Sequence, residues 1–466
     1  MILDNAATRQ YMQLNSKRLL RESAYLKLVL TLLFSFYCYL SILPKHVDFF
    51  SLNDVAQLIA KGHFNIYEIY AESHPGIIGN MHPPLFYFID GAWIKLGSLL
   101  HIYDLDNMDC TNTSIQFWCM LPYLLVLLAC AVISYKTLKN RWLGLLWFGT
   151  FTFISVIIMG QTDIFASFFI FISTIVMIKG FYSDNYALFM YIGLMSLSVS
   201  TLIKTYGFLL FPLYLIIIIK LIYQRTEDIG LRFKHYSILL ILASFALVSP
   251  MLIYGKWVSG IASGESSWVF NLQTFGAGPF QVISIWLIGY CIIIYKMVKR
   301  LLEISLPQEY TDFFVFFGLL NISWFFISVY SHPQWWLILV PFIIAVIDNS
   351  DRASNYIFAA LIYNLFLLYP MRWINGIDII LKEYIFVMPI EGNNSIILFT
   401  LMAATLAIWI IELKKEIENN DSKLDAERKR TLKENIILPV IVLISPLAIV
   451  VLMPRIVELL GAIFSP

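Results

Sequence analysis

The residues that can do chemistry gather in one polar stretch, which follows the first long apolar segment and ends at Tyr87. It contains Asp48 near its start and His82 just before a Pro-Pro corner. A carboxylate a few residues beyond a membrane helix lies at the boundary between water and lipid. There it can meet a water-borne hydroxyl and a lipid-borne phosphate. Asp48 is therefore our candidate for a general base that takes a proton from an attacking hydroxyl.

A second interpretation of Asp48 is structural. A carboxylate at the water–lipid boundary can also cap a short helix without taking part in chemistry. Asp54 follows about six residues later, so on a helix it would point to a different face, and we expect it to be structural.

The elements that must position these residues are membrane helices. Hydrophobic residues make up 59% of the 466-residue chain and charged residues only 14%. Apolar runs of about 20 residues recur to the C-terminus, as in integral membrane proteins with many spanning helices. The formal net charge of +1 gives no reason to expect a nucleic-acid partner. We expect residues 1–466 to form a single all-α polytopic membrane domain.

The apolar runs predict about thirteen transmembrane helices. They fall near residues 25–43, 117–135, 142–159, 163–181, 186–203, 206–223, 236–255, 280–297, 312–330, 334–348, 355–370, 395–413 and 436–453. If the N-terminus is cytoplasmic, the connections rich in Lys and Arg all fall on the cytoplasmic side, as the positive-inside rule requires. These connections are residues 136–141, 179–185, 220–234, 296–309, 348–352 and 414–433.

This topology holds only if residues 84–100 do not cross the membrane. The segment carries Asp90 and Lys95, and roughly 17 residues at ~1.5 Å each reach only about 25 Å. We therefore expect a helix that lies in the outer interface or is re-entrant. Residues 44–116 then form a first outer loop with interfacial helices, and residues 414–435 form a charged cytoplasmic loop.

The polar corners of the later segments fall on the same outer side. They are Gly160-Gln161-Thr162-Asp163, Lys204-Thr205-Tyr206-Gly207, the segment His332-Pro333-Gln334-Trp335-Trp336, and residues 371–394 with Arg372. The connections on the cytoplasmic side are charged but poor in motifs. We therefore expect the outer face to be the working face.

Two of these motifs resemble the first outer loop of the GT-C superfamily, the membrane glycosyltransferases that use polyprenyl-phosphate sugars. One is the string of Asp48, Val55-Ala56, Leu58, Gly62 and Tyr67. The other is His82-Pro83-Pro84-Leu85-Phe86-Tyr87, which is similar to the family's aromatic-Pro-Pro-Leu corner, with His where Tyr or Lys is common.

Two later motifs resemble a mannosyltransferase-like branch, relatives of the enzymes that build glycosylphosphatidylinositol anchors. They are residues 160–163, and residues 332–336 followed by Pro341. The resemblance implies inverting transfer of a sugar, such as mannose or another hexose, from a polyprenyl-phosphate donor to a hydroxyl of a glycan, lipid or protein. Because the leaving group is a phosphate, the enzyme must hold its negative charge and deprotonate the acceptor.

The candidates for holding the phosphate are Arg372, Lys204, His332 and His82. We rank Arg372 first, because the positive-inside bias makes an outer Arg costly unless it serves a purpose. Lys204 can also be a snorkelling anchor at a helix end, and His332 can instead bond to a helix end.

Further residues that we expect near the substrate are Gln161, Asp163, Tyr206 and Gln334. Asp163 has a second interpretation as a helix cap favoured by the macrodipole. Trp335 and Trp336 can either stack on a sugar or belong to an ordinary aromatic belt.

No cofactor is required by the pattern, and no spacing of ligands demands a metal, although the GT-C resemblance leaves a divalent cation open. The five cysteines show no metal spacing. Cys110 and Cys119 can form a disulfide only if their segment faces an oxidising compartment.

Two other functions stay open beside the enzyme. A flippase or transporter of a lipid-linked sugar would show inverted repeats and polar groups near the bilayer midplane, and a glycan polymerase would use a large, Arg-rich late loop. We expect an envelope glycan enzyme of the bacterial plasma membrane, with the endoplasmic reticulum as the alternative location.

Overall fold

The computed structural model describes residues 3–42, 45, 47–73, 83–253, 274–275, 283–328, 333–350, 353–368 and 393–419. The regular secondary structure of this part is helical apart from two short strands, β1 (Thr274–Phe275) and β2 (Ile283–Ser284). The two strands pair antiparallel, with Thr274 opposite Ser284. The all-α class is therefore confirmed for the described residues.

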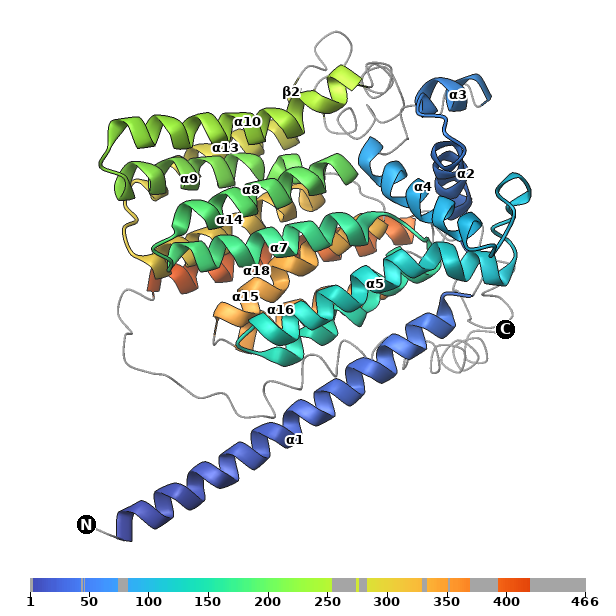
Figure 1. The fold of residues 1–466 in the computed structure, drawn as a ribbon. Helices are drawn as coiled ribbons and strands as arrows, with labels where there is room; N and C mark the ends of the chain where they lie inside the picture. The colour runs from blue at the N-terminus through green and yellow to red at the C-terminus, as the bar shows by residue number, and fades with distance from the viewer. Residues whose placement is uncertain are drawn as a thin grey trace, which may run out of the picture.

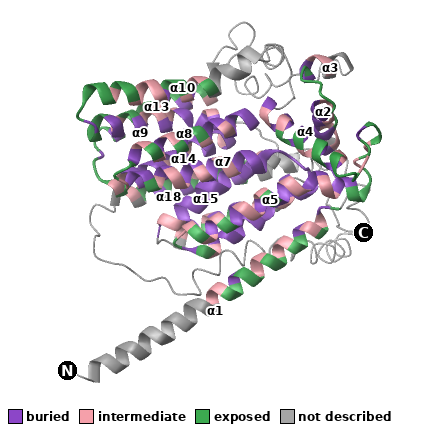
Figure 2. Cartoon of the chain, viewed as in Figure 1, coloured by how far each residue is buried: buried purple, intermediate pink, exposed green. Residues whose placement is uncertain are grey.

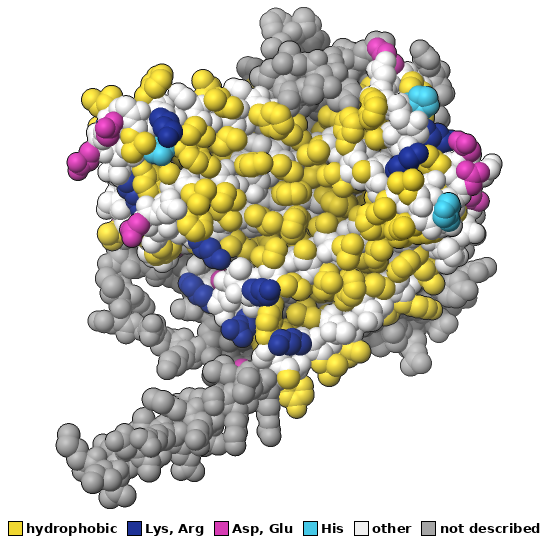
Figure 3. Space-filling model, in the orientation of Figure 1, with side chains coloured by type: hydrophobic (Ala, Val, Ile, Leu, Met, Phe, Trp, Pro, Cys, Tyr) yellow, Lys and Arg dark blue, Asp and Glu magenta, His cyan; other side chains and the backbone are white. Residues whose placement is uncertain are grey.

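Six helical segments in the described part are long and apolar enough to cross a membrane. They are Glu22–Leu40 within α1 (Leu3–Leu40), α5 (Thr113–Thr137), the segment Arg141–Ile158, α7 (Asp163–Phe181), α8 (Tyr186–Ile203) and α14 (Pro307–Ser328). Hydrophobic side chains cover the middle of the molecule between two ends where charged residues gather (Figure 3). The chain is thus suited to be embedded in a membrane.

Further helices occupy all but the last of the other predicted spans. They are α9 (Phe211–Arg225), α10 (Ile229–Ile253), α13 (Ile285–Leu301), α15 (Val340–Asn349), α16 (Ala353–Leu368) and α18 (Asn393–Asn419). The predicted span at 436–453 and most of the loop at 414–435 lie outside the described residues. The total of about thirteen spans therefore stays a prediction.

The first loop contains three helices, α2 (Val47–Ala60), α3 (Ile66–Ser73) and α4 (Pro84–Leu99). They gather at one end of the bundle (Figure 1), which we call the first-loop end. With 16 residues, α4 is shorter than the six long apolar helices. It crosses α2 closely, since a Cβ on Gly91 would lie 2.8 Å from the carbonyl oxygen of Ala56. It is also joined to α5, where the rings of Trp93 and Trp118 stack with centroids 4.6 Å apart.

The opposite end of the bundle, the connector end, is where α5, α7, α9 and α13 finish (Figure 1). Each of these helices has Lys or Arg in its last turn. Arg225 at the end of α9 donates 2.7 Å to the carbonyl of Phe181 at the end of α7. Connections that the sequence predicts on the cytoplasmic side are thus in contact with one another.

Helix α7 lies at the centre of the bundle, packed against α5, α8, α14 and α15 (Figure 2). Small residues let α7 and α8 approach closely, and Ser173 Oγ donates 2.6 Å to the carbonyl of Gly193. Because its first residue is Asp163, this central position places a carboxylate inside the first-loop end of the protein.

Candidate functional site

The segment before α7 contains an irregular turn. The predicted span at 142–159 is built from a 3₁₀-helix, η3 (Arg141–Phe148), a short α6 (Thr150–Thr152) and a π-helix, η4 (Phe153–Ile158). In a regular α-helix the amide of Gln161 would bond to Ile157, but here it donates 2.9 Å to the carbonyl of Ser155. Gly160 ends the segment at this bond, and π-helical turns such as η4 are frequent at functional sites.

Gly160 closes this turn against α2. Its φ is +60°, which favours glycine, and a Cβ there would lie only 2.5 Å from Cδ2 of Phe49. The turn therefore brings residue 161 against the start of α2.

Asp48 lies in the first turn of α2, where the helix dipole favours a carboxylate. Gln161 Nε2 donates to Asp48 Oδ2 at 2.7 Å. The Asp48 side chain is half-buried, while Asp54 is exposed. Two residues that the sequence placed in separate motifs are thus in direct contact, and the carboxylate keeps access to the surface.

Asp163 and Lys204 form a buried ion pair. Lys204 ends α8, and its Nζ lies 2.7 Å from Asp163 Oδ2, with side-chain exposures of 7% and 1%. The cap residue of α7, Thr162, makes no side-chain capping bond. Asp163 thus sits in the first turn, as the cap interpretation requires, but it bonds to a lysine. Lys204 is buried, which differs from an exposed snorkelling anchor.

The second oxygen of Asp163 is unsatisfied. Asp163 Oδ1 is buried and has no hydrogen-bond partner among the described residues, and the same holds for the neighbouring Thr162 hydroxyl. Buried polar atoms of this kind call for an explanation such as a ligand or an ordered water.

Aromatic rings lie beside the ion pair. Lys204 Nζ is 5.6 Å from the ring centroid of Tyr206, and the rings of Tyr206 and Trp335 are 5.6 Å apart. Both rings are half-buried. Trp336 is fully buried and stacks on Phe326 at 4.7 Å. Trp336 therefore belongs to the core, whereas Trp335 and Tyr206 are only half-buried.

Sequence reasoning missed Lys45. It lies between α1 and α2, is buried, and donates to the Ile157 carbonyl. Burial lowers its pKa to about 7. A lysine just after an apolar run is usually an interface anchor, so only the three-residue distance from Asp48 could have drawn attention to it.

Asp90 is a second buried group whose role the sequence did not predict. It belongs to α4 and is fully buried, and this burial raises the pKa of its carboxyl to about 7. Its Oδ2 and the hydroxyl of Tyr123 have no hydrogen-bond partner among the described residues. In the sequence, the signal for Asp90 was a carboxylate within an otherwise apolar helical segment.

Several predicted residues lie outside the described part of the chain. These are His82, His332 and Arg372, together with the side chain of Gln334, whose backbone belongs to η7 (Pro333–Leu339). Cys110 and Cys119 are free thiols. Among the described residues no group of three or more His, Cys, Asp or Glu could hold a metal ion.

The first-loop end thus brings together a half-buried carboxylate held by an amide, a buried ion pair and two aromatic rings. This arrangement can accept a proton from a hydroxyl, and its lysine and rings can contact a polar ligand with an anionic group. No protein-family profile, curated protein or solved structure matches this chain.

Proposed function

We propose that this chain is a membrane glycosyltransferase that moves a sugar from a polyprenyl-phosphate donor to a hydroxyl acceptor. The observation that carries the proposal is the 2.7 Å bond from Gln161 to Asp48. It joins two of the four motifs that resemble the GT-C superfamily. In this proposal the protein has about thirteen spans and a cytoplasmic N-terminus, and the first-loop end faces outward.

Asp48 is the proposed general base. The reaction needs a carboxylate that a water-borne hydroxyl can reach. Asp48 meets this requirement, because it is half-buried in the first turn of α2. The amide of Gln161 holds the carboxylate in place, and in this proposal the carboxylate takes the proton of the acceptor hydroxyl. The acceptor oxygen then attacks the anomeric carbon, and the sugar–phosphate bond breaks with its electrons going to the phosphate.

The leaving phosphate needs a cation. Lys204 is the described candidate, although its ammonium already bonds to Asp163, so a phosphate would have to share it. Arg372 is the further candidate from the sequence, because a guanidinium can hold a phosphate by a bidentate contact. The half-buried rings of Tyr206 and Trp335 would border the sugar.

A transporter of lipid-linked sugars is the second candidate. It is favoured by the interruption of the segment Arg141–Ile158 by 3₁₀ and π turns, since transporters often use broken helices. Against it, the polar groups lie at helix ends, at the start of α7 and the end of α8, whereas transport sites lie near the bilayer midplane.

The test is transfer by purified protein from a panel of polyprenyl-phosphate hexoses to soluble and lipid acceptors. Asp48→Asn keeps the size of the side chain but cannot accept a proton, so transfer should fall by about 10²–10⁴ while the donor still binds. Asp54→Asn is the matched control, because Asp54 lies on the same helix with an exposed side chain. A wild-type protein that transfers none of the sugars, or an active Asp48→Asn variant, would overturn the proposal.

A further inference from the structure

The end of the π-helix η4 leaves a main-chain acceptor that a lysine fills. Because the amide of Gln161 turns back to Ser155, the carbonyl of Ile157 loses the partner that a regular helix would give it. The ammonium of Lys45 donates to this carbonyl. A buried backbone oxygen is rarely left without a partner, and here the partner comes from a residue 112 positions away.

Burying the amine of Lys45 costs free energy, and a residue that only anchored the chain would not need to be buried. Its side chain is 6% exposed, although a lysine beside a membrane helix normally extends its charge into water. Burial disfavours the charged form and lowers the pKa of Lys45 to about 7. The fold therefore keeps an unfavourable buried amine, which bonds to the carbonyl of Ile157.

Three contacts join the two short segments 45–49 and 157–161. Lys45 donates to the Ile157 carbonyl, Gly160 fits against the ring of Phe49, and Gln161 donates to Asp48. The first and last of these contacts lie at opposite ends of the paired segments. Together they fix both the distance and the rotation of α2 relative to the turn.

We propose that Lys45 is a positioning residue that holds Asp48 in line with Gln161 by fastening the start of α2 to the π-helix. This inference rests on the proposed role of Asp48 as the base. Lys45 itself does not touch the substrate. It acts through the turn, where a displacement of about 1 Å can lower a rate roughly 100-fold.

The experiment compares Lys45→Met, which keeps the apolar stem but removes the donor, with Lys45→Arg, which keeps a donor. We expect kcat for transfer to fall about 10- to 100-fold in Lys45→Met, with KM for the donor nearly unchanged. Lys45→Arg should recover part of the loss. Lys61→Met is the matched control, because Lys61, directly after α2, pairs with the exposed side chain of Asp106 at 3.4 Å. If Lys45→Met fails to fold, Lys45→Leu replaces it, because it also removes the donor and should show the same loss of kcat.

Hydrogen–deuterium exchange of the same variants gives a readout that does not need the enzyme activity. Loss of the Lys45 bond should speed exchange in residues 47–50 and 157–162 but leave the end of α7 unchanged. Normal kcat in Lys45→Met, or unchanged exchange in both segments, would overturn the inference. A wild-type protein without transferase activity would instead overturn the proposed function, and the exchange data would still decide whether Lys45 fixes the turn.

Discussion

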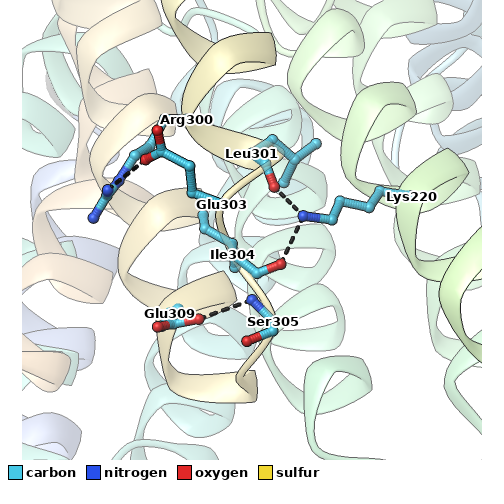
Figure 4. A network of polar contacts seen from close by, with 7 residues as sticks. All are labelled: Lys220, Arg300, Leu301, Glu303, Ile304, Ser305 and Glu309. Carbon is cyan, nitrogen blue, oxygen red and sulfur yellow. Dashed lines mark hydrogen bonds and ion pairs between the residues drawn. The ribbon is translucent and has the colours of Figure 1, made fainter.

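The two ends of the bundle use charged residues in opposite ways. At the connector end, charges satisfy helix ends. Lys220 donates to the carbonyls of Leu301 and Ile304, the second at 2.6 Å, and Glu309 accepts from the amide of Ser305 at 2.8 Å (Figure 4). Glu309 also accepts from the amide of Leu306 at 2.9 Å. These contacts fill the orphan groups that every helix end leaves, so stability alone accounts for them.

At the first-loop end, charges are buried and bonded in ways that helix ends do not require. Asp163 is at the start of α7 but bonds to Lys204, and its other oxygen has no hydrogen-bond partner among the described residues. A buried ion pair often adds less stability than a well-packed apolar pair would. Ionisable groups within membrane helices are therefore functional candidates by default, and the difference between the ends favours this end as the working one.

The largest effect should come from breaking the buried pair. Asp163→Asn or Lys204→Met each leaves one buried charge without its partner, so each should lower the free energy of unfolding by about 3–5 kcal/mol. The double variant removes both charges and should recover much of the loss.

The measurement is reversible unfolding in mixed micelles, with Arg300→Ala as the control. Arg300 pairs with Glu303 in the open, at side-chain exposures of 49% and 56%, so its loss should be below about 1 kcal/mol. If Arg300→Ala lost as much free energy of unfolding as Asp163→Asn or Lys204→Met, the two ends of the bundle would not differ in how their charges act.

The next effect concerns Asp90 and pH. Burial raises the pKa of the Asp90 carboxyl from 3.8 to about 7. At a pH between these two values the folded protein therefore holds a proton that the unfolded chain has released. Stability should therefore fall as pH rises through this window. Asp90→Asn is neutral throughout, so it should match the wild type near pH 4 and exceed it at pH 8 by up to roughly 4 kcal/mol. Thermal unfolding from pH 4 to pH 8 measures this. Parallel pH curves for the two proteins would mean that Asp90 is ionised at neutral pH.

The smallest effect should come from the connector end. Lys220→Met removes charge-assisted bonds to two carbonyls, and because the side chain is only partly buried we expect a loss of about 1–2 kcal/mol. Sugar transfer per folded molecule should stay unchanged. A loss of transfer in this variant, measured alongside Asp48→Asn, would show that function is not confined to the first-loop end.

The sequence predicts most of the helices, because an apolar run of about 20 residues has few alternatives to a helix in lipid. It does not predict the length of α1, which begins at Leu3 rather than near residue 25. Hydropathy detects the part of a helix that lies in lipid, and the polar turns before it are invisible to that measure.

The site is harder to predict than the helices. The sequence places four motif residues on one side of the membrane, and the structure brings them into contact as two pairs, Asp48 with Gln161 and Asp163 with Lys204. These pairings depend on how α7 packs on α8 and on the turn at η4. An apolar run looks the same whether its turns are α, 3₁₀ or π. Lys45 has its role only because of that turn, so it could not be recognised before the fold was known.

The π-helix before Gly160 also bears on how such a site can arise. A π turn holds one residue more than an α turn, so the segment can be regarded as a plain helix with a single-residue insertion. Deleting one residue from 153–158 would restore the α-helix and rotate everything after it by about 100°. The Gln161 side chain would then face away from Asp48, although no residue of the pair had changed. The geometry is thus encoded by the number of residues in this turn as well as by their identities, and an insertion could create it in one step.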